Sequence, residues 1–131
     1  MNKSDLIKIR NIRDEDFPFI LDSWLKSLRY SNDTFKLIDK QAYKRFYPQV
    51  ITALLLRSMV QVACLQADED VILGYSVVQG PTLHFVFVKE PWRRIGLMND
   101  LVKGPIESIS HITKPFIPLM KKHKWSYNPF L

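Results

Sequence analysis

The stretch HFVFVKEPWRRIGLMNDLV, residues 84–102, decides the fold. It begins as an apolar strand, passes through a loop that holds Arg93, Arg94 and Gly96, and ends with the residue spacing of a helix. The first turn of a helix carries amide N–H groups without partners, and such groups bind anions. Gly96 allows an anion to approach the backbone, while the two guanidinium groups add donors and charge. The stretch therefore predicts a phosphate-binding loop.

Two further strands precede this stretch. Three strand-like runs are expected at 59–67, 71–79 and 82–89, joined by turns at 68–70 and 80–81. Because the turns are short, these strands should be antiparallel neighbours.

Strands and helices are also expected on both sides of these runs. Residues 5–13 alternate like a half-buried strand, and two helices with apolar stripes should follow, the first after Asp16 and the second capped by Asp39. Pro48 lies within the second stripe and predicts a kink or two shorter helices. The elements expected after the loop are a helix over 96–103, a strand over 108–114, a helix over 115–123 and an edge strand over 125–131.

This order predicts an α+β fold, layered α/β/α, in which helices flank a mainly antiparallel mixed sheet. The chain has 131 residues and 47% hydrophobic content, so we expect one domain over residues 1–131. Its formal net charge of +6 favours anionic partners. The start has no apolar signal core and no run is long enough to span a bilayer, so a cytoplasmic protein without a membrane partner is expected.

The string from Val88 to Met98, taken with the order of elements, resembles the GNAT superfamily of N-acetyltransferases. In that family a strand ends in an apolar residue, and a motif Q/R-x-x-G-x-G/A opens a helix five residues later. Val88 stands at the strand end here, and Arg93, Gly96 and Met98 stand at the motif positions.

The resemblance implies an acetyl-CoA-dependent N-acetyltransferase that moves an acetyl group to a primary amine of a small molecule or protein by direct attack on the thioester. It implies that backbone amides around Arg94, Ile95, Gly96, Leu97 and Met98 hold the pyrophosphate, with Arg93 beside them. It also implies that the strand edge at Phe87, Val88 and Lys89 pairs with the pantetheine arm of acetyl-CoA.

The sequence departs from the family pattern at two positions. Met98 replaces a small residue of the motif, and Met120 stands where many members carry a tyrosine that protonates the thiolate. Gly104-Pro105 also shortens the helix after the motif. These departures keep open a second hypothesis, a catalytically degenerate GNAT-like module that acts as a protein-binding or structural partner.

Proton transfer during acetyl transfer suggests two catalytic candidates. His84 lies on the expected cofactor strand, with alternation placing it on the face of Val86 and Val88, and is our candidate base. Its place is similar to that of a histidine in the arylalkylamine N-acetyltransferases. Tyr127 is the candidate acid, and Tyr75 on the neighbouring strand is the alternative. No Cys/His cluster has metal-ligand spacing, so no metal is expected.

Other partners follow from charge and loop position. A nucleic-acid-binding domain is a third hypothesis, but its usual sequence patterns are missing and nucleic acid is not expected to bind. A homodimer is compatible with the sequence. Residues 27–34 (SLRYSNDT) are our candidate for a lid that touches the amine substrate.

Overall fold

Six strands form one sheet in the order β1-β2-β3-β4-β5-β6 in the structure, a computed structural model that describes residues 3–131. Their bounds are β1 Ile7–Asn11, β2 Met59–Leu65, β3 Ile72–Gln79, β4 Thr82–Val88, β5 Ser108–Ile109 and β6 Ser126–Tyr127. The first four strands are antiparallel, and β4, β5 and β6 pair in parallel. The prediction of a mainly antiparallel mixed sheet is confirmed.

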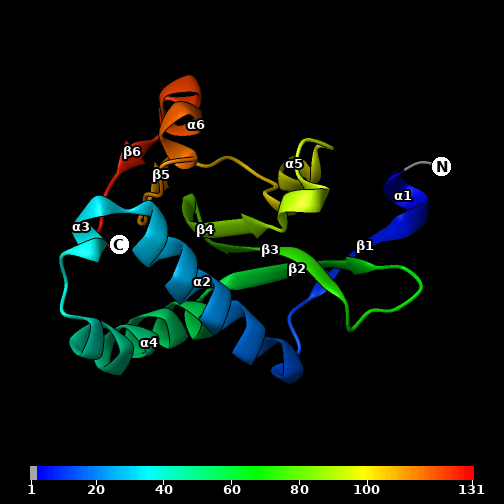
Figure 1. The fold of residues 1–131 in the computed structure, drawn as a ribbon. Helices are drawn as coiled ribbons and strands as arrows, with labels where there is room; N and C mark the ends of the chain where they lie inside the picture. The colour runs from blue at the N-terminus through cyan, green and yellow to red at the C-terminus, as the bar shows by residue number, and fades with distance from the viewer. Residues whose placement is uncertain (1–2) are drawn as a thin grey trace.

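Helices lie on both sides of this sheet (Figure 1). Their bounds are α1 Lys3–Leu6, α2 Phe17–Ser31, α3 Asp33–Lys36, α4 Lys40–Arg57, α5 Leu97–Leu101 and α6 Phe116–His123, with 3-10 turns at Asp14–Asp16 (η1) and Glu90–Trp92 (η2). The Tyr75 hydroxyl of β3 is hydrogen-bonded to the Ser23 hydroxyl of α2. The side chain of the next residue, Ser76, donates a hydrogen bond to the Leu101 carbonyl of α5. Since successive side chains of a strand point to opposite faces, α2 and α5 cover opposite faces of the sheet. Among the described residues, no helix has the length and apolar character that a membrane span requires.

The two long helices pack on one face because their apolar residues recur at helical spacing. Ile20, Trp24 and Leu28 of α2 are fully buried at intervals of four residues. The predicted cap of α4 is confirmed, because the Asp39 side chain accepts from the Ala42 amide at 2.9 Å. The alternative of two shorter helices at Pro48 is wrong, since α4 runs unbroken from Lys40 to Arg57.

The predicted strands over 108–114 and 125–131 are much shorter in the structure. β5 ends at Ile109 because the chain then turns toward the end of α2. The Asn32 side chain donates to the Ile112 carbonyl at 2.7 Å, and the Lys114 amide donates to the Ser31 carbonyl at 3.0 Å. These backbone groups are satisfied by Ser31 at the end of α2 and by Asn32, which follows it, so they are not available to extend the sheet.

At Gly74 the backbones of β3 and β4 leave no room for a side chain, and this gives a first prediction. A Cβ at this position would lie 2.5 Å from the Phe87 carbonyl oxygen. Gly74→Ala should therefore force the two backbones apart and lower the free energy of unfolding by about 1–3 kcal/mol. Urea denaturation of both proteins measures the change, and an unchanged midpoint would contradict it.

Candidate functional site

A gap opens beside β4 because β5 pairs with only the first two residues of β4. Thr82 pairs with Ser108 and Leu83 with Ile109, and the Ser110 amide then donates to the Leu83 carbonyl at 3.3 Å. Beyond that bond β4 continues to Val88, while residues 110–114 leave toward α2. The second half of β4 is therefore an open strand edge.

The edge presents backbone groups of Val86 and Val88. The Lys89 amide donates to the Leu73 carbonyl of β3 at 2.8 Å, so the groups that alternate with it, those of Val88 and Val86, point toward the gap. The Val88 carbonyl accepts from Arg93 Nε at 2.7 Å, which agrees with this direction. An extended ligand arm can add to such an edge as a further strand does.

The loop after β4 gathers amide donors and positive charge at one end of the gap. Arg94 and Gly96 both have left-handed backbone conformations, with φ of 67° and 80°. Among residues 5–131, no backbone or side-chain acceptor takes a hydrogen bond from the amides of Arg94 to Met98. Arg93, Arg94 and Gly96 are exposed. This loop has the donors and the access that an anion needs.

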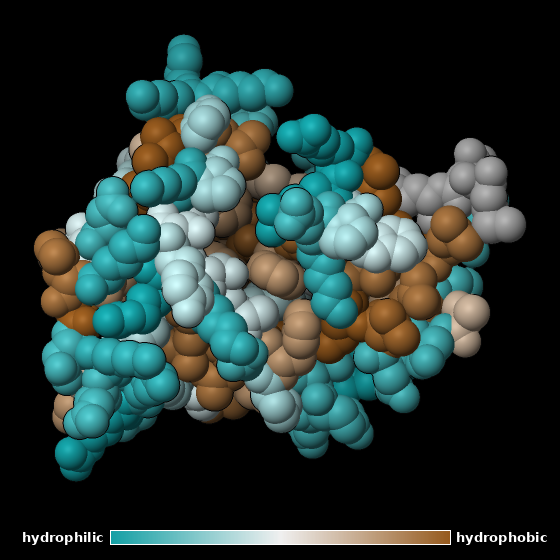
Figure 2. Space-filling model, in the orientation of Figure 1, coloured by the Kyte–Doolittle hydropathy of each residue, from teal (hydrophilic) through white to brown (hydrophobic). Residues whose placement is uncertain are grey.

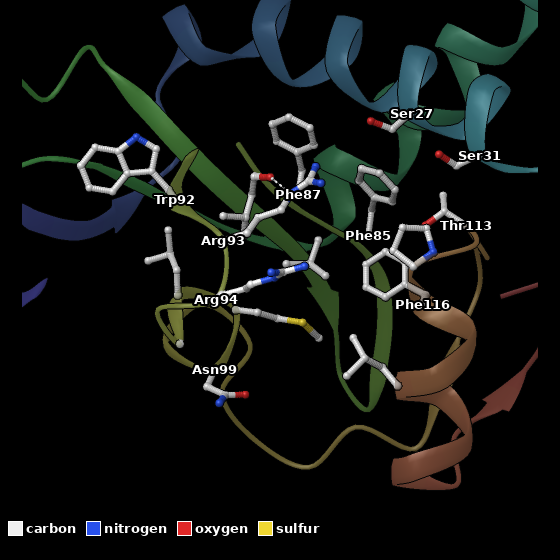
Figure 3. A pocket seen from close by; sticks show the side chains of 17 residues that line it. Ser27, Ser31, Phe85, Phe87, Trp92, Arg93, Arg94, Asn99, Thr113 and Phe116 are labelled. Carbon is white, nitrogen blue, oxygen red and sulfur yellow. Dashed lines mark hydrogen bonds between the residues drawn. The ribbon is translucent and has the colours of Figure 1, made fainter. Parts of the chain in front are cut away.

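A cleft of about 380 Å³ runs from this loop along β4 (Figure 3). Seven of the nine predicted cofactor-binding residues line it: Phe87, Val88, Arg93, Arg94, Gly96, Leu97 and Met98. Lys89 and Ile95 do not line it: the Lys89 ammonium lies over the Phe19 ring, and the Ile95 side chain lies at the surface outside the lining. Figure 2 shows the surface hollowed here, with hydrophobic residues in the hollow and hydrophilic residues on its rim.

The other end of the cleft is built by residues that the sequence analysis largely missed. Figure 3 shows Ser27, Ser31, Phe85, Thr113 and Phe116 together, across the cleft from the loop that carries Arg93 and Arg94. Ser27 and Ser31 belong to the segment 27–34 that was expected to touch the substrate. Thr113 and Phe116 carry no local signal, because their place depends on the turn of residues 110–114 toward α2.

His84 does not line this cleft. It lies at a β-bulge, since Val77 pairs with Phe85 and Val78 with Leu83, which leaves His84 as the extra residue of β4. The bulge breaks the alternation that was expected to place His84 on the face of Val86 and Val88. The ring is completely buried, with Nδ1 2.6 Å from Ser110 Oγ and Nε2 2.9 Å from Gln79 Oε1.

These contacts belong to a chain of five side chains. His111 Nδ1 lies 2.8 Å from Ser110 Oγ, and His111 Nε2 lies 2.5 Å from the Tyr47 hydroxyl. The Gln79 oxygen can only accept, so His84 Nε2 donates and its Nδ1 accepts from Ser110. Ser110 then accepts from His111 Nδ1, and His111 Nε2 accepts from Tyr47. Every bond is made when both histidines are neutral, so at neutral pH the chain links β3, β4, the segment that follows β5, and α4.

This chain predicts a loss of stability in mild acid. Burial, with the nearby charge of Arg57, lowers the pKa of His84 to about 4, and burial, with His84 beside it, lowers that of His111 to about 4. An unfolded histidine has a pKa of about 6.5. The neutral folded form is therefore fully stable above pH 6.5, and the free energy of unfolding should fall toward pH 4 by up to about 1.4 kcal/mol per pH unit for each histidine.

Urea denaturation at a series of pH values measures this slope. The double variant His84→Gln and His111→Gln should lose most of the slope between pH 6.5 and 4, even if it is less stable at pH 7. An unchanged slope would assign the acid sensitivity to other groups.

The two tyrosines considered for the proton chemistry lie outside the cleft. Tyr127 is on β6 and 45% exposed. Tyr75 is fully buried, and its hydroxyl lies 2.7 Å from Ser23 Oγ and donates to the Ile20 carbonyl at 3.2 Å. Burial raises the pKa of Tyr75, so this hydroxyl stays protonated. The catalytic roles of His84 and Tyr127 stay predictions. In the described part of the chain, no group of three or more His, Cys, Asp or Glu side chains is placed to hold a metal ion.

Comparison with known proteins finds likeness in structure and not in sequence. Neither a protein-family model nor a curated protein matches the chain. The "putative acetyltransferase" YycN of Bacillus subtilis matches with 13% identity over 93% of each chain and a TM-score of 0.61. A "possible acetyltransferase" of Clostridium difficile 630 matches with 17% identity over 91% of this chain and 88% of its own, with a TM-score of 0.55.

The apo form of YjaB from Escherichia coli matches with 20% identity and a TM-score of 0.50, over 72% of this chain. This chain spans 60% of the length of YjaB. At such identities the likeness concerns the fold, including the six-stranded mixed sheet with helices on both faces. This chain therefore has the fold of the acetyltransferases represented by YycN and the Clostridium difficile protein.

Proposed function

We propose that the cleft binds acetyl-CoA and that the chain transfers the acetyl group to an amine. The observation that carries this proposal is the continuity of the cleft, which joins a basic loop, an open strand edge and a far end lined by aromatic rings and hydroxyl groups. A ligand with a diphosphate at one end and an extended amide-bearing arm would meet these surfaces in that order, with its diphosphate at the basic loop and its arm along the strand edge.

The residues present fit acetyl-CoA in order along the cleft. The amides of Arg94 to Met98 and the two guanidinium groups would hold the diphosphate, and the backbone of Val86 and Val88 would hold the arm. Acetyl-CoA supplies a thioester, whose acetyl group an amine takes by direct attack. The protein residues supply position, exclusion of water by Phe85 and Phe87, and hydrogen bonds.

The fold comparisons support this proposal. YycN and the Clostridium difficile protein are both described as acetyltransferases, and they match this chain over nine-tenths of its length.

Calorimetric titration with coenzyme A tests the proposal directly. Saturable binding below millimolar concentration is expected, with an affinity that falls as salt is added, because charged groups hold the phosphates. No heat of binding at millimolar coenzyme A would remove the proposal.

A non-catalytic module that binds a partner protein is the second candidate. It is favoured by Met98, which lines the cleft at a position where the motif has a small residue, and by His84, whose two ring nitrogens are both occupied. Release of free thiol from acetyl-CoA, measured over a panel of amines, separates the candidates. Steady release that depends on the amine would exclude the module.

A further inference from the structure

The far end of the cleft is an aromatic wall with hydroxyl groups around it. The Phe85 ring stacks on Trp24, with centroids 4.9 Å apart and planes 5° apart, and meets the Phe116 ring at 6.2 Å and 64°. Ser27 and Ser31 lie one helical turn apart on α2 and line the same space with Thr113 (Figure 3). Because Trp24 is fully buried, the Phe85 ring is held in place.

The charge of the cleft lies at its opposite end. Among the described residues of the lining, the ionisable side chains are those of Arg93 and Arg94, beside the phosphate-binding loop. The histidines nearest to the far end are His111, whose ring packs on Trp24 at 5.4 Å, and His84. Both use their two ring nitrogens within the protein, so neither is placed to take a proton from a substrate.

This arrangement discriminates between amines by their basicity. An alkylammonium group resembles that of lysine, with a pKa of about 10.4, so at pH 7 about one molecule in 2,500 is neutral. The charged form would have to leave water for a wall of rings and hydroxyls without a carboxylate, and this costs free energy. The nitrogen lone pair of an aromatic amine is delocalised into its ring, so such an amine is already neutral at pH 7.

We propose, resting on the acetyl transfer proposed above, that the acceptor is an uncharged aromatic amine. Its ring lies against Phe85 and Phe116, and its amino group faces the hydroxyls of Ser27, Ser31 and Thr113. The nitrogen lone pair forms the new N–C bond to the thioester carbonyl, and the C–S bond breaks with its electron pair on sulfur. The displaced N–H proton passes through water to the thiolate, so no ionisable protein group is needed.

Two isomeric amines, 4-methylaniline and benzylamine, test this proposal because they share composition and size and differ in basicity. Calorimetry at pH 7 with the coenzyme A-loaded protein should show 4-methylaniline binding at least tenfold more tightly than benzylamine. In thiol-release assays, kcat/KM for 4-methylaniline should be constant from pH 6 to 9. For benzylamine it should rise about tenfold per pH unit below the amine pKa, as the neutral fraction does.

Variants of Ser27 locate the binding. Ser27→Leu adds volume to the far end and should weaken the binding of 4-methylaniline at least tenfold, with the Kd of coenzyme A unchanged. Ser27→Ala removes the hydroxyl without adding volume, and should weaken it two- to fivefold. Melting curves confirm that both variants are folded.

The outcomes separate this proposal from the one on which it rests. No binding of coenzyme A removes both. If coenzyme A binds, three results would each remove the aromatic-amine proposal and leave the coenzyme A site intact. The protein could prefer benzylamine at pH 7, it could bind neither amine, or a protein group with a pKa near 7 could control the turnover of 4-methylaniline.

Discussion

Arg94→Ala is expected to weaken coenzyme A binding by about 10- to 100-fold, because a charge-assisted hydrogen bond to phosphate contributes about 1.5–3 kcal/mol. Arg94 lines the cleft and is exposed, and its backbone has the left-handed conformation that turns the loop. The remaining affinity should also depend less on salt, since one charge contact is gone.

Arg93→Ala should have a smaller effect. Arg93 Nε already donates to the Val88 carbonyl at 2.7 Å, a group on the strand edge that the arm of coenzyme A would use. Removing Arg93 therefore loses a positive charge and at the same time frees an acceptor on that edge.

Calorimetry on matched variants measures both effects. Arg45→Ala is the control, because it removes one positive charge from the exposed surface of α4, outside the cleft lining. If Arg45→Ala weakens coenzyme A binding as much as Arg94→Ala does, coenzyme A is attracted by the net charge of the protein and the loop is not its binding site.

Asp16→Ala is expected to lower the free energy of unfolding by about 3–5 kcal/mol, the usual cost of leaving one charge of a buried pair without its partner. The Asp16 carboxylate accepts from the Arg10 guanidinium in two bonds of 2.7 and 3.0 Å, and from the Arg13 amide at 2.7 Å. Arg10 and Asp16 are 9% and 4% exposed. The pair attaches the start of α2 to the edge strand β1.

Glu69→Ala supplies the contrast. Glu69 accepts from Lys8 and Arg13 at the surface, with a third of its side chain exposed, so its loss should lower the free energy of unfolding far less than the loss of Asp16. Arg10→Met combined with Asp16→Leu should recover most of the stability, because no charge is then left buried. Urea denaturation of the four proteins is the measurement, and equal losses for Asp16→Ala and Glu69→Ala would contradict the argument.

The same carboxylate gives a pH dependence of known sign. Burial pushes the pKa of Asp16 upward, but the hydrogen bonds from Arg10 and the Arg13 amide outweigh it, and the pKa is lowered. Its contribution is therefore complete above the unfolded value of about 3.9 and is lost as the pH falls through the lower folded value. The slope expected for His84 and His111 lies at higher pH, between 6.5 and 4, so the two effects can be separated.

Most of the elements could be predicted from local patterns. The strand-like runs between 59 and 89, with short turns between them, predicted the three central strands, and apolar residues at helical spacing predicted the buried stripe of α2. The alternative of two shorter helices at Pro48 was wrong, because a proline removes one amide donor but the other turns of α4 still hold the helix together. The predicted strand face of His84 was wrong for another reason. Alternation assumes that each residue of β4 pairs with one residue of β3, and the bulge adds an unpaired residue that only the pairing of the two strands reveals.

The sequence by itself determined the order of the elements and the basic loop from Arg93 to Met98, because both depend on residues that are neighbours in the chain. The tertiary structure alone decided that the loop opens into a cleft. Residues 110–114 satisfy their backbone groups at the end of α2, so β5 leaves β4 after Leu83. That departure exposes the edge of β4 and brings Thr113 and Phe116 opposite Ser27 and Ser31, contacts between segments too distant in sequence for any local pattern to record.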